Sequence, residues 1–253
     1  MIRQVTLQDE AMFLRAAELY PPAGISAATA WELYKDFPSQ AMFWMTADNS
    51  VAISAVDGEV SVSVAEGLDI RELCDFIRTV GFNTLNAPPI ICESLCSMGR
   101  LEAGAVMEYH GEVQYIGYDA AEADIREAYE LVCKVSEQIT YDPVWSPWYV
   151  YLSLLKRRGI GRYVGIHENG ILVSTAGIYA QSSERALIAG TVTLPEFRGR
   201  GFAGKLVQFL VREISVSGKK AFLLCDDKLC AWYKGLGFEK SGIWNKLYNG
   251  ERA

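Results

Sequence analysis

Two stretches of the chain alternate apolar and polar residues with the period of β-strands. Residues 42–67, MFWMTADNSVAISAVDGEVSVSVAEG, contain three such runs, separated by the turn dipeptides Asp-Asn and Asp-Gly. Residues 162–195 contain three more runs, separated by Asn-Gly and Ser-Ser. Each stretch therefore predicts a meander of three antiparallel strands.

Patterns with the helix period surround both meanders in the same order. A pair of helical segments precedes each meander, and a helix, a strand, a second helix and a second strand follow it. In the first half we expect helices over 7–20, 27–36, 69–81 and 90–99, and strands over 82–87 and 104–111. In the second half we expect helices over 121–139, 147–158, 202–218 and 229–237, and strands over 220–226 and 238–248.

The common order predicts an internal repeat, although few residues are identical between the halves. We place the boundary near Gly111 and expect domains of residues 1–111 and 112–253. The predicted fold class is α/β, or more narrowly α+β. Each domain should hold a mixed, mostly antiparallel, twisted sheet flanked by helices.

The composition is that of a globular protein and excludes several functions. Half of the residues are hydrophobic and the mean hydropathy is +0.08. A net charge of −7 argues against nucleic-acid binding, which needs clustered Lys and Arg. No apolar run reaches the about 20 residues of a membrane span, and no secretory signal is visible, so we expect a cytoplasmic protein that does not bind membranes. The spacing of the cysteines and histidines does not fit a metal site.

Glycine and positive charge gather in one segment, residues 196–206, EFRGRGFAGKL. It joins the end of a predicted strand to an amphipathic helix. Backbone N–H groups at a helix start have no intrahelical partner and carry the positive end of the helix dipole. Gly199 and Gly201 would let a ligand approach them, and Arg198 and Arg200 add charge. The segment predicts a diphosphate site; the alternative is a glycine-rich turn with solvated arginines.

The same glycines also fit the GxGxxG pattern of dinucleotide-binding folds. Asp226 and Asp227 lie about 20 residues further on, where that fold places a ribose-binding acid. Against this, residues 195–197 separate the strand from the first glycine, and the strands before it form an antiparallel meander instead of a parallel sheet. A nicotinamide-dependent oxidoreductase is therefore the weaker alternative.

Two blocks of the second half resemble the GCN5-related N-acetyltransferase (GNAT) superfamily. RGRGFA, residues 198–203, matches its acetyl-CoA signature, and CAWYKGLGFEKSG, from residue 230, resembles its penultimate helix. The first block is preceded by the residues that the family usually has there, and the second carries a tyrosine before Gly-Phe. These positions are Thr193, Pro195, Glu196, Phe197, Tyr233, Gly237 and Phe238.

The resemblance implies transfer of an acetyl group from acetyl-CoA to a primary amine of a small molecule by direct attack. Tyr233 would protonate the departing thiolate. The residues implied in acetyl-CoA binding are Thr193, Leu194, Arg198, Gly199, Arg200, Gly201, Phe202 and Ala203. Two positions depart from the family pattern: Asp226 stands where many members have asparagine, and residues 185–194 contain no carboxylate that could act as the base. Deprotonation of the amine would then need a water chain or a carboxylate such as Asp142 or Glu168.

The first half lacks the glycine pattern. Glu66 and Asp69 occupy the corresponding helix start, so we interpret this half as a copy that has lost acetyl-CoA. Asp142, Trp145 and Trp148 are the candidate acceptor residues, since aromatic rings beside an acid suit a cationic amine. The chain would act as a monomer or homodimer. A non-catalytic acyl-CoA sensor stays open as an alternative.

Overall fold

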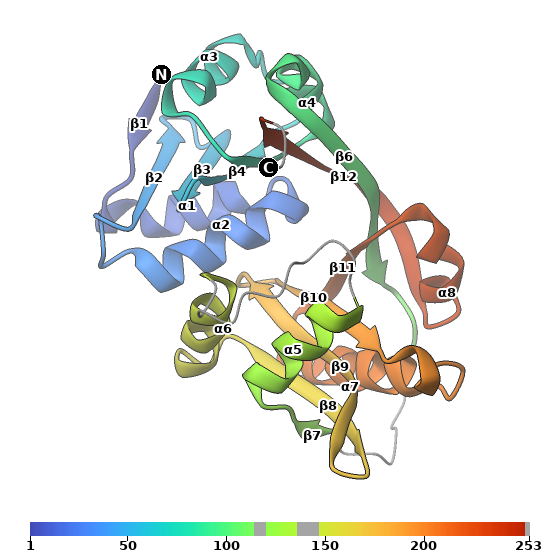
Figure 1. Ribbon diagram of the computed structural model, residues 1–253. Helices are drawn as coiled ribbons and strands as arrows, with labels where there is room; N and C mark the ends of the chain where they lie inside the picture. Colours follow the sequence, from blue (N-terminus) through green and yellow to red (C-terminus); the bar gives the residue numbers. More distant parts are fainter. Residues whose placement is uncertain (114–119, 136–146, 251–253) are drawn as a thin grey trace.

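The computed structural model describes residues 1–113, 120–135 and 147–250. Figure 1 shows two groups of helices and strands, one from each half of the sequence, with two long strands that run from one group to the other. The N-terminal half contains β1 (Ile2–Gln4), α1 (Glu10–Ala17), α2 (Pro21–Tyr34), β2 (Ala41–Thr46), β3 (Val51–Val56), β4 (Glu59–Val64), α3 (Arg71–Val80), β5 (Thr84–Ala87), α4 (Pro89–Ser94) and β6 (Gly99–Tyr109).

The C-terminal half repeats this order of elements. It contains β7 (Ala121–Glu122), α5 (Ile125–Val135), α6 (Pro147–Arg157), β8 (Arg162–Glu168), β9 (Ile171–Gln181), β10 (Arg185–Thr193), α7 (Phe202–Val216), β11 (Lys220–Cys225), α8 (Cys230–Lys234) and β12 (Phe238–Asn249). Short 3-10 helices cover Leu7–Asp9, Cys96–Met98, Pro195–Phe197 and Asp227–Leu229. Both predicted meanders are present, as β2–β4 and β8–β10, and the predicted mixed α/β fold class is confirmed.

The described strands form one continuous sheet in the order β1-β2-β3-β4-β5-β12-β6-β11-β10-β9-β8-β7. Most neighbours are antiparallel, but β4 pairs with β5 and β10 with β11 in parallel. The last strands of the two halves are exchanged: β12 lies between β5 and β6, and β6 lies between β12 and β11. Each half therefore depends on the other for its sheet, and the division into residues 1–111 and 112–253 stays a prediction.

Helix α2 joins the two halves through their cores. It begins at Pro21, earlier than the predicted residue 27, because proline suits the first positions of a helix, whose N–H groups have no partner. It is buried on several sides: Trp31 packs in the core of the N-terminal half, Leu33 in that of the C-terminal half, and Ile25 against residues of β6, β9 and β11. A helix that is apolar all round is expected in such a position.

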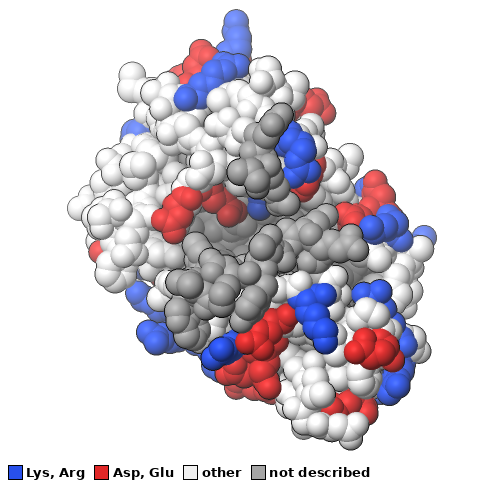
Figure 2. All heavy atoms as spheres, in the orientation of Figure 1, with Lys and Arg blue, Asp and Glu red and all other residues white. Residues whose placement is uncertain are grey.

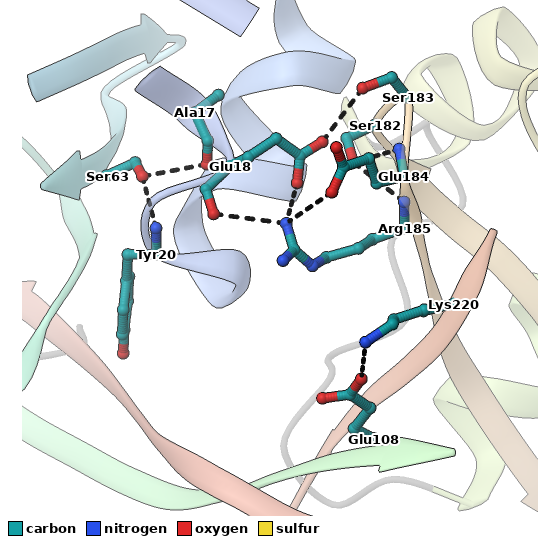
Figure 3. A network of polar contacts seen from close by, with 10 residues as sticks. All are labelled: Ala17, Glu18, Tyr20, Ser63, Glu108, Ser182, Ser183, Glu184, Arg185 and Lys220. Atoms are coloured by element: carbon teal, nitrogen blue, oxygen red, sulfur yellow. Dashed lines mark hydrogen bonds and ion pairs between the residues drawn. The ribbon is translucent and has the colours of Figure 1, made fainter. Parts of the chain in front are cut away.

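A polar network closes the contact between the halves at the start of β10 (Figure 3). The Glu18 carboxylate, between α1 and α2, forms an ion pair with Arg185, and the Ser183 hydroxyl donates to it at 3.3 Å. The two charged side chains are only 15% and 19% exposed. Nearby, the buried Thr29 hydroxyl of α2 donates to the Gln181 carbonyl at 3.0 Å and accepts from the Gln181 amide at 2.8 Å. These bonds hold the β9–β10 hairpin against the N-terminal half.

Candidate functional site

Strands β10 and β11 separate part of the way along their length. Their parallel pairing runs from Arg185–Lys220 to Ile188–Leu223 and then stops. Strand β10 continues to Thr193, so the residues after Ile188 have no strand paired with them on the β11 side within the described part of the chain. Backbone N–H and C=O groups on that side are available to an extended ligand, which can pair with them as an added strand would.

At the end of β10, Thr193 faces this opening and Leu194 does not. The Leu194 amide donates to the Val173 carbonyl of β9 at 2.9 Å, and the Leu194 carbonyl accepts from the Phe197 amide at 2.9 Å. Since successive residues of a strand direct their backbone groups to opposite sides, those of Thr193 point away from β9. The Thr193 carbonyl accepts from Arg198 Nε at 3.2 Å. These bonds engage both backbone groups of Leu194 and the Thr193 carbonyl, and the Thr193 amide faces the opening. The roles of Thr193 and Leu194 in binding stay predictions.

The predicted glycine-rich loop leads from β10 into α7. Gly199 and Gly201 both have a φ of +77°, a conformation that L-residues with side chains rarely adopt, and Gly201 is the N-cap of α7. A β-carbon at either glycine would meet open space. Among the described residues, no acceptor is found for the backbone amides of residues 199–204. The loop therefore presents a run of free N–H groups to the solvent.

Positive charge surrounds these amides. Arg198 and Arg200 are exposed, and the Arg200 guanidinium lies over the Phe197 ring at 4.9 Å. Phe202 and Ala203 form the first turn of α7, where the helix dipole adds to the positive potential. Free amides, a helix start and two guanidinium groups are the donor set that binds a diphosphate.

Tyr233 of α8 lies beside the opening between β10 and β11. It is 7% exposed, and its ring packs edge-to-face against Trp232 and Phe238. Burial, with a smaller contribution from the nearby Cys225 thiol, raises the pKa of Tyr233 to about 12, and an interaction with the Thr191 side chain partly opposes both effects. Tyr233 therefore holds its proton at pH 7, next to the unpaired segment of β10.

Comparisons with known proteins agree with this geometry. Residues 163–248 match the family model described as FR47-like protein. A GCN5-related N-acetyltransferase from Kribbella flavida has 16% identity and a TM-score of 0.62, covering 92% of this chain and 97% of its own. A GNAT-family acetyltransferase from Colwellia psychrerythraea has 14% identity and a TM-score of 0.54, covering 99% and 100%. A tandem GNAT protein from the clavulanic acid biosynthesis pathway has 14% identity and a TM-score of 0.59, covering 100% and 99%.

This chain has the GNAT fold. The predicted resemblance is thus confirmed, and the antiparallel pairing of β8, β9 and β10 does not fit the parallel sheet of the dinucleotide-binding alternative.

A comparison with curated proteins found no match. No helix among the described residues is long and apolar enough to cross a membrane. Within the same residues, no cluster of His, Cys, Asp and Glu could hold a metal ion.

Within the described residues, the N-terminal half has no opening like the one between β10 and β11. There, β4 pairs with β5 only over Glu59–Ser61, so these strands also separate, but Tyr20 fills the gap. The Tyr20 amide donates to Ser63 Oγ at 2.8 Å, and its hydroxyl donates to the Ile243 carbonyl of β12 at 2.8 Å. The start of α3 is also occupied, because the Asp69 carboxylate accepts a hydrogen bond from the Arg71 amide at 3.1 Å.

Of the predicted acceptor residues, Asp142 and Trp145 lie outside the described residues. Trp148 lies in the first turn of α6 and packs between the rings of Tyr129 and Tyr179, with centroid distances of 4.8 and 5.9 Å. Its structural role is therefore clear, and its role in binding an acceptor stays a prediction.

The candidate base Glu168 ends β8 at the turn into β9. The unpaired part of β10 lies opposite Gly177, Thr175 and Ser174 of β9, and Ile171, the first residue of β9, pairs with Glu168. Ser174, the nearest of the three, is three positions from Ile171, about 10 Å along the strand, and the role of Glu168 as the base stays a prediction. Sequence reasoning missed two residues at this place, Gly190 and Tyr179, although an isolated glycine within a strand pattern is a signal for a bulge.

On the face drawn in Figure 2, acidic and basic side chains are interspersed.

Proposed function

We propose that this chain is an acetyltransferase that transfers the acetyl group of acetyl-CoA to a primary amine of a small molecule. One observation carries the proposal: the opening between β10 and β11 leads at one end to free amides at the start of α7 and is flanked by the protonated phenol of Tyr233. An extended thiol ester with a diphosphate at its far end needs these two features in this arrangement.

The residues present fit such a molecule. The amides of residues 199–204, with Arg198 and Arg200, would bind the diphosphate, and the open space above Gly199 and Gly201 would let its oxygens approach. The backbone of Thr193 would pair with the amide groups of the pantetheine arm. Acetyl-CoA, when bound, supplies the thioester that the amine attacks.

Tyr233 would act as the general acid. When a neutral amine attacks the thioester carbonyl, a C–N bond forms and the C–S bond breaks. The nitrogen releases one proton to water and negative charge develops on sulfur. A phenol whose pKa is raised to about 12 keeps its proton until that charge appears and can then donate it to the thiolate. The interaction with the Thr191 side chain places the phenol beside the unpaired part of β10.

Each chain would bind one acetyl-CoA. In the N-terminal half, Tyr20 occupies the gap between β4 and β5, and Asp69 places negative charge at the start of α3. Both features oppose a second diphosphate and a second pantetheine arm. We propose that this half completes the sheet and supports the C-terminal site.

Thermal unfolding with added ligands tests the binding part of the proposal. Acetyl-CoA and CoA should raise the melting temperature and NAD should not, because a ligand that binds only the folded state stabilises it. Replacing Gly201 and Ala203 together with leucine should abolish the shift. Gly218→Leu is the matched control, since Gly218 has the same φ of +77° and open space at the other end of α7. An acetyl-CoA shift that survives in the double variant would contradict the loop assignment.

Release of free CoA thiol in the presence of a panel of amines tests the catalytic part. Tyr233→Phe should lower turnover by about 100-fold, the lower end of the usual effect of a general acid, with little change in acetyl-CoA affinity. Binding of acetyl-CoA without thiol release from any amine would favour the sensor alternative, for which the lack of a carboxylate on β10 is the supporting observation.

A further inference from the structure

Two irregularities lie side by side in the β9–β10 pair, next to the proposed acetyl site. In β9, Tyr179 is an extra residue, because Leu187 pairs with Ala180 while Ile188 already pairs with Ile178. In β10, the register shifts again between Ala189 and Val192. Bulges of this kind often re-aim side chains at functional sites.

The side chain of Tyr179 ends on the backbone of the second bulge. Gly190 has a φ of +62°, and a β-carbon at this position would collide with the Tyr179 hydroxyl oxygen. Only glycine leaves room for the phenol there. Among the described residues no hydrogen-bond partner is found for that hydroxyl, although the residue is only half-buried.

The ring of Tyr179 is held firmly. Its neighbours are the ring of Trp148 from α6 at 5.9 Å and that of Tyr163 from β8 at 5.2 Å between centroids. The Tyr151 hydroxyl of α6 donates to the Tyr179 carbonyl at 2.7 Å. A fixed ring with an unpartnered hydroxyl at its tip is a preorganised binding group. Burial raises the pKa of Tyr179, so its phenol is neutral and can accept a hydrogen bond from N–H.

Two phenols therefore reach consecutive residues of β10. The Tyr179 hydroxyl of β9 contacts Gly190, and the Tyr233 phenol of α8 lies close enough to the Thr191 side chain for it to affect the pKa of Tyr233. Consecutive α-carbons are about 3.8 Å apart. Direct attack needs two polar groups near one carbon, since the amine nitrogen and the thioester sulfur are both attached to it in the transition state and each needs a partner within about 3 Å.

We propose that the Tyr179 hydroxyl binds the attacking amine, accepting one of its N–H groups and directing the nitrogen lone pair toward the acetyl carbon. This inference rests on the proposed function, in which Tyr233 serves the sulfur. The ring of Trp148 beside it suits an acceptor that arrives as an ammonium ion on an apolar or aromatic body and releases one proton to water before it attacks, since cations are attracted to aromatic faces.

Steady-state kinetics of Tyr179→Phe test the inference, with Tyr163→Phe as the matched control. Tyr163 belongs to the same ring cluster, and its buried hydroxyl has no partner among the described residues, so its removal leaves the reaction unchanged. Tyr179→Phe should lower kcat/KM for the amine by about 10-fold, the usual worth of a hydrogen bond, mainly through KM. The acetyl-CoA dissociation constant and the melting temperature should stay the same.

The outcomes separate this inference from the proposed function. Wild-type protein that binds acetyl-CoA but acetylates no amine overturns both. Active wild-type protein with an unchanged amine KM in Tyr179→Phe overturns only the role of Tyr179. Equal losses in Tyr179→Phe and Tyr163→Phe, or a weaker acetyl-CoA affinity in Tyr179→Phe, would also overturn it, because they indicate a disturbed ring cluster instead of a lost contact with the amine.

Discussion

The ion pair between Glu18 and Arg185 allows a quantitative test of how the two halves are joined. We consider Arg185→Met, which keeps the length and apolar part of the side chain but removes the charge. The change breaks the pair with Glu18, a 3.3 Å hydrogen bond to the Glu18 carbonyl and the contact of the guanidinium with the Phe222 ring at 5.8 Å. Glu18, which is only 15% exposed, then keeps the Ser183 hydroxyl as its one donor among the described residues.

The size of the effect follows from this burial. Removing one partner of a fully buried pair costs about 3–5 kcal/mol, mainly because the other charge stays buried without compensation. Since both side chains keep some solvent contact, we expect about 2–3 kcal/mol for Arg185→Met and a similar loss for Glu18→Gln. The double variant should lose only about 1–2 kcal/mol, because no charge is then left alone. A loss of 2–3 kcal/mol lowers the melting temperature by about 5–10 °C in a chain of this size.

Urea unfolding of the wild type, both single variants and the double variant measures the coupling. Arg71→Met is the matched control, because Arg71 and Asp69 form a pair whose side chains are 88% and 60% exposed. That control should lose less than about 1 kcal/mol. A double variant that loses the sum of the two single losses would refute the reasoning, since the charges would then not depend on each other.

Three further predictions concern acidity, backbone strain and domain structure. Because the pKa of Tyr233 is raised from 10.0 to about 12, its contribution to stability is complete below pH 10 and is lost as the pH rises toward 12. The difference in free energy of unfolding between wild type and Tyr233→Phe should therefore change with pH only in that range. Gly190→Ala should destabilise the fold by about 2–3 kcal/mol more than Gly67→Ala in urea unfolding, since both glycines have positive φ but only Gly190 meets another side chain, Tyr179. A fragment of residues 112–253 should fail to show a cooperative transition, because it lacks β6 between β11 and β12; cooperative unfolding of that fragment would mean that the exchange of strands is not needed for folding.

Sequence reasoning was most successful where the signal is local. The glycine-rich loop could be predicted because glycine, proline and a following amphipathic pattern restrict the backbone within a few residues. The observed φ of Gly199 and Gly201 and the start of α7 agree with that pattern. The backbone contacts at the end of β10 were harder to predict from the sequence, since the pairing of Leu194 with Val173 depends on the register of two strands.

By itself, the sequence determined the order of helices and strands, the repeat of that order and the chemistry of the loop after β10, because each depends on periodicity and conformational preference over short distances. Tertiary structure alone decided that β6 and β12 exchange places, that Tyr20 fills one gap and that Tyr179 meets Gly190. These outcomes join residues far apart in the chain, and the free energy that selects them comes from burial and hydrogen bonds formed only when the whole sheet is assembled.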